Sequence, residues 1–463
     1  MSFLKFVCMK MPTFLLLLLL LNLKGLGQDT YSPTHLRQDL DSLVYQIEAA
    51  HPNPYYRYSK SRFYKDIKYA KAQFHKSMNY MEFYFVAQRL VAKLEDGHID
   101  MEMPIGMFKK TQINSFPNQV TVNAKKPFIL VKSPGDQRST DITEGCEILS
   151  INDISAQKIS KDIVSLVTGE SVEFRAKYGS KYFDFFLNQL YPQSGFYKIS
   201  YSKNNEIKSI TISGKPVEVI KKAADTLVST KIFKEPFNLK IVKQATALMT
   251  LSDFIDMGKF KVFADSAFEH IKNQKVDHLI IDLRDNLGGD SDVGDYLLQY
   301  LLNIPFRQYD NVIAKNSQLL KNRLLSHRIG KQLSHGDTLL LSKRNGTIDT
   351  LKSEPDALLK LPNRFYGKVS LLINTQTFSS AADFAQAFSF YNRGMLIGQE
   401  TGGFILSFGD IVPGTLPHTK MPFVVSSKLY LNIGAKVGDW HGVIPTIPTK
   451  SNEALVQALI LSR

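Results

Sequence analysis

The C-terminal half of the chain alternates short apolar runs with segments of helical periodicity, and this alternation restricts the fold more than any other feature. The apolar runs are TALMTLSDF, HLIIDLR, KVSLLIN and GMLIG. Helical spacing of apolar residues occupies the intervals around 263–271 and 293–302 and the segment that begins at Ser380. Strands that alternate with helices predict an α/β fold with a largely parallel sheet. A polar, lysine-rich insertion interrupts the pattern at about 316–361.

Two regions of different character precede this α/β region. Residues 29–104 contain HLRQDLDSLVYQIEAA and MEFYFVAQRLVAKL, whose apolar residues recur every three or four positions and predict helices. Residues 105–214 contain short strand-like runs separated by turn residues, with one helical run near 160–167. The predicted organisation is a helical N-terminal domain, a β-rich domain and an α/β core over 215–463, all preceded by a leader at 1–28.

The leader has the composition of a secretory signal peptide. Lys5 and Lys10 precede the almost pure leucine run 14–21, and the small residues Gly25 and Gly27 follow it. The apolar run is short for a membrane span. We therefore expect the leader to be cleaved and the mature protein to be soluble, in the periplasm or outside the cell, with no stable membrane span. An uncleaved N-terminal anchor is the alternative.

Composition and charge exclude some classes of function. With 44% hydrophobic residues, the 463-residue chain has enough apolar material for the cores of two or three domains. The net charge of +14 comes from lysines scattered along the chain, without a basic stretch interleaved with aromatic residues, so no nucleic-acid partner is expected. Once Cys8 leaves with the leader, Cys146 is alone, which excludes an internal disulfide and a cysteine metal cluster.

The segment NTQTFSSAADFAQAF joins an apolar run to a helical pattern at two serines, Ser379 and Ser380. The apolar residues that follow share one helical face and put Ser380 at the helix start. One interpretation is structural, with Ser380 and Asp383 forming a capping box worth about 1 kcal/mol. A second interpretation is catalytic: a strand-to-helix turn exposes the Ser380 hydroxyl where the helix N-terminus stabilises negative charge and small neighbours leave room for a substrate.

A second junction, HLIIDLRDNLGGDSDVGDYLLQYLL, contains a strand, a loop with Gly288 and Gly289, and a helix. Paired glycines let backbone N–H groups approach a ligand closely, as an oxyanion hole requires. The Walker pattern and a G-x-G-x-x-G motif are absent, which argues against a phosphate site. A tight turn is a simpler interpretation, and a calcium site from Asp285, Asp290 and Asp292 is a third, although the spacing does not match an EF-hand loop.

In their order along the chain, these motifs resemble the tail-specific, or C-terminal-processing, serine peptidase family. LIIDLRDNLGG is followed by VSLLINTQTFSSAADFAQAF and then ETGG, the helical lead-in ends in LEDGHI, the β-rich region carries EGCEILSINDISAQKISKDI, and HGVIPTIPT stands near the end. The resemblance extends over most of the chain. It implies a ClpP/crotonase-like α/β catalytic core with a helical N-terminal domain and a PDZ-like β-rich domain.

The resemblance also implies roles for individual residues. Ser380 would be the nucleophile, and Gly288, Gly289 and the Ala381 amide would form the oxyanion hole. Three polar residues would brace the glycine loop rather than react, namely Asp282, Arg284 and Asn286.

The general base departs from the commonest pattern of the family. Members with a Ser/Lys dyad carry the lysine in the strand after T-x-G, where this chain has Phe404, which cannot accept a proton. The tricorn-like branch instead uses a histidine before the PDZ-like region and a carboxylate close to the final G-V-x-P motif. His98 in EDGHI and Asp439 in GDWHGVIP stand at the matching places, and histidine suits proton transfer near neutral pH. The predicted triad is Ser380, His98 and Asp439.

Three further residues are candidates for these roles. Glu400 in GQETGG is a second candidate for the carboxylate that orients the base, and His418 and His441 are further candidate bases. His51 and Trp440 are expected to pack rather than to act on substrate.

The sequence thus predicts an exported serine peptidase that hydrolyses protein or peptide substrates through an acyl-enzyme on Ser380, without a metal ion or an organic cofactor. A strand edge of the PDZ-like domain is expected to capture substrate C-termini by β-augmentation. Two rival functions are not catalytic. One is a member of the same fold that lost activity with the lysine and binds peptides or hydrophobic ligands, and the second is a PDZ scaffold for partner proteins.

Overall fold

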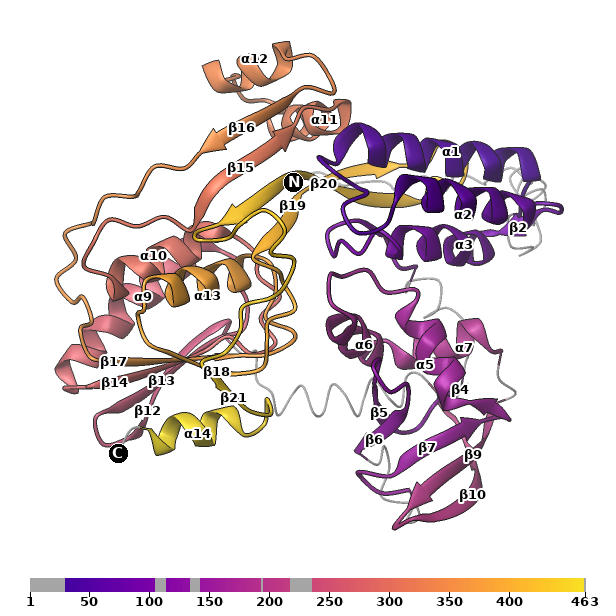
Figure 1. Cartoon of the computed structure of the whole chain (residues 1–463), viewed down its shortest axis with the longest axis horizontal. Coiled ribbons are helices and arrows are strands. Elements are labelled where there is room, and N and C mark those ends of the chain that lie inside the picture. The colour runs from indigo at the N-terminus through magenta and orange to yellow at the C-terminus, as the bar shows by residue number, and fades with distance from the viewer. Residues whose placement is uncertain (1–29, 105–113, 134–141, 193–194, 217–234, 462–463) are drawn as a thin grey trace, which may run out of the picture.

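The computed structural model describes residues 30–104, 114–133, 142–192, 195–216 and 235–461, in a helical layer, a β-rich part and an α/β part (Figure 1). The predicted leader lies outside the described residues. Among the described helices, none is long and apolar enough to cross a membrane.

The helical layer follows the apolar periodicity of residues 29–104. Its elements are β1 (Thr30–Tyr31), α1 (Pro33–Ala50), α2 (Lys60–Ala72), β2 (Met78–Asn79), α3 (Tyr80–Ala92) and β3 (Asp100–Met101). The Ser32 side chain accepts from the His35 amide at the start of α1, and Pro33 fits the first helical turn because it needs no N–H acceptor there. Asn79 and Glu82 form a capping box at the start of α3.

The β-rich part is a six-stranded antiparallel sheet with helices packed on it. The strands are β4 (Asn114–Ser115), β5 (Gln119–Val122), β6 (Ile129–Ser133), β7 (Glu147–Ile151), β8 (Ile154–Ser155), β9 (Phe196–Lys203), β10 (Glu206–Ser213) and β11 (Lys215–Pro216). The six-stranded sheet has the order β10-β9-β7-β6-β5, with β8 paired to β7, and β4 and β11 form a separate two-stranded sheet. The helices are α5 (Ala156–Val164), α6 (Val172–Lys181) and α7 (Phe183–Leu190). The sequence predicted one helix here, so α6 and α7 are additional.

The α/β part confirms the predicted parallel sheet. Its strand order is β12-β13-β14-β17-β18-β21, and every pair is parallel except β12 with β13. The strands are β12 (Phe237–Lys243), β13 (Thr246–Leu251), β14 (His278–Asp282), β17 (Lys368–Ile373), β18 (Met395–Gly398) and β21 (Ile447–Pro448). Its helices are α9 (Met257–Asn273), α10 (Ser291–Leu301), α13 (Ser380–Phe390) and α14 (Ala454–Ile460). Helices α9, α10 and α13 cover one face of the sheet and α14 the opposite face (Figure 1).

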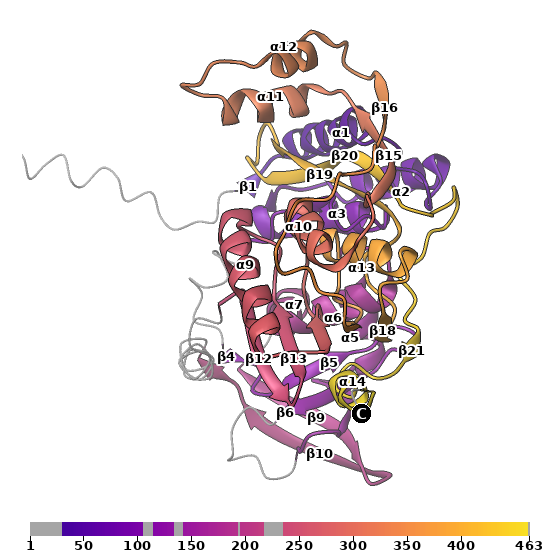
Figure 2. The same ribbon diagram turned by 90° about the vertical axis from the view of Figure 1, so that its left-hand side faces the viewer.

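A second sheet connects the α/β part to the helical layer. It contains β15 (Tyr309–Lys315), β16 (Ile348–Lys352), β19 (Leu406–Thr415) and β20 (Pro422–Asn432), in the order β16-β15-β20-β19. Strand β3 pairs with β20, at Met101 with Phe423. The predicted polar insertion forms α11 (Gln318–His327), α12 (His335–Ser342) and β16, and α11 lies beside α1 (Figure 2).

The helical layer shares its core with the rest of the molecule. One continuous apolar cluster joins Leu36 and Leu40 of α1 to Leu319 of α11 and to Val412 and Phe423 of the second sheet. This shared core fixes the loop after α3 relative to the α/β part, because burial of apolar surface holds both sides of the cluster together.

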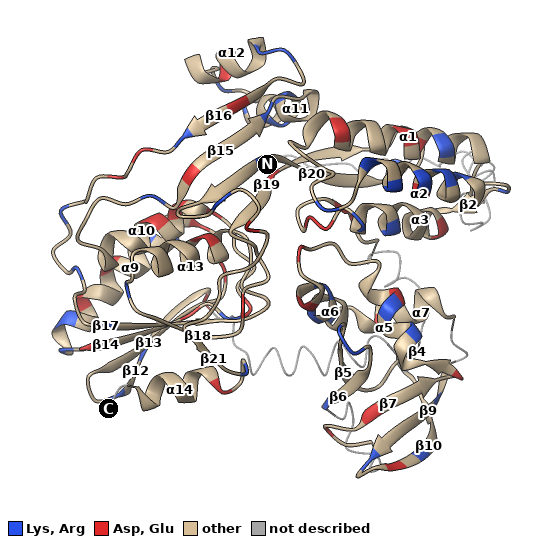
Figure 3. Ribbon diagram, viewed as in Figure 1, with Lys and Arg blue, Asp and Glu red and all other residues tan. Residues whose placement is uncertain are grey.

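Charge is distributed over all three parts. Figure 3 shows Lys and Arg on helices and strands throughout the molecule, with a concentration on α2, whose sequence is KSRFYKDIKYAKA. Many of these cations are paired, as in Lys60 with Glu48 and Lys71 with Asp41. The pattern agrees with the scatter of lysines in the sequence.

Candidate active site

The candidate site lies where two neighbouring parallel strands, β14 and β17, end in loops that lead into α10 and α13. The two loops are tied together. The Asp285 amide donates to Asn374 Oδ1 at 3.0 Å, and the Asn374 side-chain amide donates to Asp285 Oδ1 at 3.0 Å. Since the carboxyl ends of parallel strands share one edge of the sheet, the glycine loop and the double serine are held next to each other.

Ser379 is the residue at the turn between β17 and α13. Its backbone has φ 50° and ψ −135°, outside the regions that residues with a side chain ordinarily occupy, and α13 begins at the next residue. Its side chain makes no capping hydrogen bond to the helix, and it is partly exposed. A strained backbone at a functional position persists only where surrounding contacts hold it. The result is a serine hydroxyl directed away from its own helix.

His98 approaches this hydroxyl from the loop after α3. Its Nε2 lies 3.1 Å from Ser379 Oγ, a hydrogen-bond distance across 281 positions of sequence. Its ring stacks on that of Phe378, with centroids 5.1 Å apart. The His98 side chain is 16% exposed, so the pair is sheltered but reachable.

Asp96 stands behind His98 and is completely buried. One of its oxygens, Oδ1, accepts from the His98 backbone amide at 2.8 Å and lies 3.6 Å from His98 Nδ1. The second oxygen, Oδ2, accepts from Ser426 Oγ at 2.6 Å and contacts His51 Nε2 at 3.0 Å. Because His51 Nδ1 accepts from the Asn53 amide, the His51 proton is on Nε2 and is donated to Asp96.

The buried charges around Asp96 and His98 shift the pKa values of both side chains. Burial would raise the pKa of Asp96, but the hydrogen bond from His51 and the close contact with the His98 ring outweigh it and hold that pKa well below its ordinary value. Burial would likewise lower the pKa of His98, but Asp96 and the nearby carboxylates raise it above its ordinary value. Asp96 is thus an anion that stabilises positive charge on His98.

The structure places Ser379, and not the predicted nucleophile Ser380, within hydrogen-bond distance of His98. Ser380 is 3% exposed, and within the described residues its Oγ has no hydrogen-bond partner. The first turn of α13 buries this side chain, while the strained turn exposes the preceding one. The capping box is not formed either, because the Asp383 carboxylate accepts from Asn432 at 2.7 Å and from Tyr309 at 2.9 Å.

The structure also places a carboxylate other than the predicted Asp439 beside His98. Asp439 lies in a local turn in which its Oδ2 accepts from the Lys436 amide at 2.8 Å, and Asp96 occupies the position beside His98. Two further candidates for the orienting residue and the base are engaged elsewhere. Glu400 accepts from the Gly442 amide, and His418 stacks on His35. A carboxylate two residues before the histidine thus stands where the sequence predicted one far along the chain.

Three residues that the sequence singled out lie around the site. His441 Nδ1 contacts the carbonyl oxygen of Gly442, beside the aromatic group of Tyr56, Phe408 and Trp440. Phe404, in the lysine position of Ser/Lys dyads, is buried under the Arg57 guanidinium, 5.5 Å from its ring centroid.

The predicted oxyanion amides differ in availability. The Gly288 amide donates to Asn286 Oδ1 at 2.8 Å and the Ala381 amide to the Phe378 carbonyl at 3.1 Å, so both are already engaged. Within the described residues, the amides of Gly289 and Ser380 donate to no protein acceptor. Gly288 packs directly on the turn, because a Cβ there would lie 2.9 Å from the Ser380 nitrogen. The two uncommitted amides are therefore those of Gly289 and Ser380.

The three predicted bracing residues do hold the glycine loop. Arg284 makes a two-point contact with Asp282, at 2.9 and 2.6 Å, and a further bond to the Ser451 carbonyl. Asn286 is fully buried and donates to the Leu251 carbonyl at 3.0 Å. The calcium trio is not formed, because Asp285 binds Asn374 and Asp290 accepts from the Asp292 amide.

One group among the described residues has the donor set of a metal site. Asp96, His98 and Glu170 offer donor atoms that all lie within 4.8 Å of one another. Glu170 comes from the β-rich part, just before α6, and is 2% exposed. Burial, together with the negative charge of Asp96, raises the pKa of Glu170 to about 8.

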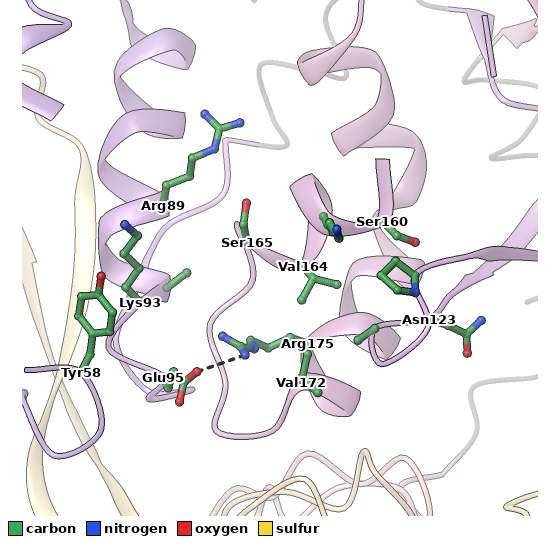
Figure 4. Close-up of a pocket in the computed structure, with 14 residues that line it drawn as sticks. Tyr58, Arg89, Lys93, Glu95, Asn123, Ser160, Val164, Ser165, Val172 and Arg175 are labelled. Carbon is green, nitrogen blue, oxygen red and sulfur yellow. Dashed lines mark hydrogen bonds and ion pairs between the residues drawn. The ribbon is translucent and has the colours of Figure 1, made fainter. Parts of the chain in front are cut away.

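Two cavities adjoin each other here, and the first of them borders this group. A cavity of about 520 Å³ is lined by residues of all three parts, including Arg57, Glu170, Thr375 and Trp440. A second, of about 420 Å³, lies between α3 and the helices of the β-rich part (Figure 4). Glu95 and Arg175, joined by an ion pair of 3.4 Å, line both cavities.

Comparison with known proteins identifies the α/β part. Residues 245–448 match the profile of peptidase family S41. These residues are an S41 peptidase domain. The match confirms the resemblance to tail-specific serine peptidases and the α/β, ClpP-like core. No curated protein sequence matches the chain.

Solved structures share the architecture of the chain over nearly its whole length. Mature CPAF has a TM-score of 0.61 and 13% identity, covering 93% of this chain and 95% of its own. Mature CPAF complexed with lactacystin has a TM-score of 0.60 and 12% identity, covering 93% and 97%. At this identity the likeness concerns the fold alone.

Proposed function

We propose that this protein is an active serine peptidase in which Ser379 is the nucleophile and His98 the general base. The observation that carries the proposal is the 3.1 Å contact between His98 Nε2 and Ser379 Oγ, at a strained turn before α13. A base within hydrogen-bond reach of a hydroxyl, with a carboxylate behind the base, is the arrangement that activates a serine for acyl transfer. The S41 domain supports peptide bonds as the target.

In the proposed reaction, His98 takes the proton of Ser379 as Oγ attacks the substrate carbonyl carbon. Asp96 stabilises the resulting imidazolium through its charge, and His51 and Ser426 hold Asp96 in place. His98 then protonates the leaving amine. A water molecule, activated by the same histidine, hydrolyses the ester and restores the free serine.

The amides of Ser380 and Gly289 would bind the oxyanion of the tetrahedral intermediate. Both are without a protein acceptor among the described residues, and the N-terminus of α13 adds a partial positive charge. In this proposal the Asn286 and Gly288 hydrogen bond keeps the glycine loop rigid rather than contributing a donor.

The cavity of about 520 Å³ beside the site is the proposed substrate cleft. Its walls carry carboxylates and cations from all three parts, which suits the polar backbone and side chains of a peptide. For β-augmentation, the edge at β5 is covered by α6, whose Ser180 hydroxyl accepts from the Val122 amide. The mostly exposed β10 is the edge that supports capture of a substrate strand by the PDZ-like domain.

Export to the periplasm or beyond is part of the proposal and rests on the leader sequence alone. It is tested by the N-terminal sequence and the location of the protein recovered from cells that express the full chain.

Labelling with a serine-directed fluorophosphonate probe tests the nucleophile. The mature protein and its Ser379→Ala, Ser380→Ala and His98→Gln variants are compared at equal concentration, with urea unfolding to show that each is folded. We expect labelling of the wild type and of Ser380→Ala, and loss of labelling in Ser379→Ala and His98→Gln. The matched control is Ser380→Ala, because it makes the same chemical change, loss of a serine hydroxyl, at the neighbouring residue.

Two outcomes would overturn the proposal. Loss of labelling in Ser380→Ala with labelling retained in Ser379→Ala would return the role to Ser380. A folded wild type that does not label would favour a non-catalytic peptide- or ligand-binding protein.

A further inference from the structure

The group formed by Asp96, His98 and Glu170 contains two buried carboxylates against one imidazole. Their donor atoms lie within 4.8 Å of one another. Asp96 and His98 come from the loop after α3, and Glu170 comes from the loop before α6. Two anions held this close are unfavourable unless a proton or a cation lies between them.

Glu170 is the member of this group that lacks a partner. It is 2% exposed, and within the described residues neither carboxylate oxygen makes a hydrogen bond of good geometry, although the backbone amides of Gly97 and Glu170 lie close to them. The two arginines that line the same cavity do not pair with the Glu170 carboxylate: Arg57 donates from Nη1 to the Glu170 backbone carbonyl at 2.7 Å and binds Glu95 through Nε at 3.1 Å, and Arg175 binds Glu95. His98 Nδ1, which faces away from Ser379, also has no hydrogen-bond partner among these residues. Buried polar groups without partners require an explanation.

We propose that Asp96 Oδ1, His98 Nδ1 and the Glu170 carboxylate form a three-ligand site for a divalent transition-metal cation, best matched by Zn²⁺. One imidazole nitrogen and two carboxylate oxygens, with a fourth position open to water, are a ligand set that zinc accepts. The Nδ1 to Oδ1 distance of 3.6 Å is close to the roughly 3.4 Å expected for two ligands in a tetrahedral zinc shell.

Glu170 is the ligand whose side chain would move when a cation binds, and it also lines the cavity through which a cation would enter. All donor atoms lie within 4.8 Å of one another, and ligands in a tetrahedral zinc shell are roughly 3.4 Å apart, so a small movement of the Glu170 side chain is enough to complete the shell. Glu170 also lines the cavity of about 520 Å³, which is the proposed substrate cleft. A cation therefore reaches it from the same side as a substrate.

Such a cation would inhibit the peptidase, and this consequence rests on the proposed function. With the metal on Nδ1, the remaining imidazole proton is on Nε2, which faces Ser379. His98 then has no lone pair to accept the serine proton. The cation would also cancel the anionic charge of Asp96 that favours the imidazolium.

Binding is tested by calorimetric titration of Zn²⁺ into the untagged mature protein, in a Ser379→Ala background so that activity plays no part. We expect about one tight equivalent per chain, and at least about tenfold weaker binding in Glu170→Gln. The matched control is Glu173→Gln, which removes a carboxylate of the same cavity that pairs with Lys125. A His418→Gln variant excludes zinc bound by the stacked His35 and His418 rings.

The proposal is overturned if no tight equivalent binds, in which case Glu170 is neutralised by a proton, or if Glu170→Gln binds as tightly as its parent. Inhibition is measured separately in chains with Ser379 intact. Zn²⁺ should slow probe labelling of the wild type, reversibly with a chelator, and should not alter the rate in Glu170→Gln. A wild type that fails to label contradicts the proposed function and leaves the calorimetric result to decide the metal site.

Discussion

The two strand-to-helix junctions at the site use the same topology for different purposes. Between β14 and α10, the glycine loop is braced, and Asp290 caps the helix in the ordinary way by accepting from the Asp292 amide. Between β17 and α13, Ser379 has a strained backbone and makes no cap. The first junction presents backbone N–H groups, and the second presents the Ser379 side chain. The Ser379 hydroxyl contacts His98 and does not cap its own helix.

The prediction with the largest expected effect concerns Asp96, the carboxylate beside His98 at the second junction. In Asp96→Asn, the side chain keeps its size but loses the charge that stabilises the His98 imidazolium. We expect kcat for peptide hydrolysis to fall by about 10³-fold. Asp439→Asn, which alters the carboxylate near the final G-V-x-P motif, should leave kcat unchanged. Equal loss in both variants would contradict the assignment to Asp96.

The next test concerns the fit between the two junctions. Gly288 has φ +90°, and a Cβ there would lie 2.8 Å from the Phe378 carbonyl oxygen. Gly288→Ala should therefore lower the free energy of unfolding by about 3 kcal/mol and reduce labelling of Ser379. Gly346 has φ +88°, and nothing lies within 4 Å of a Cβ added there. Gly346→Ala therefore measures the cost of the backbone conformation alone, about 1 kcal/mol of unfolding free energy. Urea midpoints measure both.

A smaller effect concerns pH, because each helix carries a buried aspartate. Burial, with nearby carboxylates, raises the pKa of Asp295 in α10 to about 7, and burial raises that of Asp383 in α13 to about 6. The folded state then binds more protons than the unfolded state above the ordinary pKa of 3.8. The contribution of these two groups to stability should fall as pH rises from about 4 to about 7, and Glu170, whose pKa is raised to about 8, extends the fall to about pH 8.

Asp295→Asn should remove the upper part of this fall and be more stable than the wild type above pH 7, by about 2 kcal/mol. Asp383→Asn should change the slope only up to about pH 6. Chemical unfolding at a series of pH values measures both, and a wild-type stability that rises over this interval would contradict the shifts.

The smallest expected effect separates the two serines by stability. The Ser380 hydroxyl is buried without a partner among the described residues, so Ser380→Ala should change the free energy of unfolding by less than about 0.5 kcal/mol. Ser426→Ala removes an equally buried hydroxyl that donates to Asp96 at 2.6 Å and should cost about 1–2 kcal/mol. A large loss in Ser380→Ala would mean that its hydroxyl has a role that its surroundings do not indicate.

The sequence predicted the architecture well because that depends on periodicity. Apolar runs indicated β13, β14, β17 and β18, and the S41 match agrees with the motifs. The choice between the two serines depends on one backbone angle. With two adjacent serines, the helix start decides which hydroxyl is exposed, and the strained φ of Ser379 leaves no mark in the pattern.

The remaining site residues could not be predicted from local sequence. Asp96 stands in EDGHI, but the motif order favours a distant carboxylate, although Asp96 approaches His98 through the tight turn between them. Glu170 and His51 reach the site only through packing between parts of the chain. The spacing of residues along the sequence does not predict such contacts, because they depend on the shared core of the helical layer and the second sheet.

The pairing of β3 with β20 has a consequence for biosynthesis. The strand that anchors the His98 loop pairs with residues 423–424, and the serine turn lies at 379. A ribosome must therefore complete most of the chain before the base and the serine can meet. A nascent polypeptide therefore lacks the strand partner of β3 and the serine turn until most of the chain has been made.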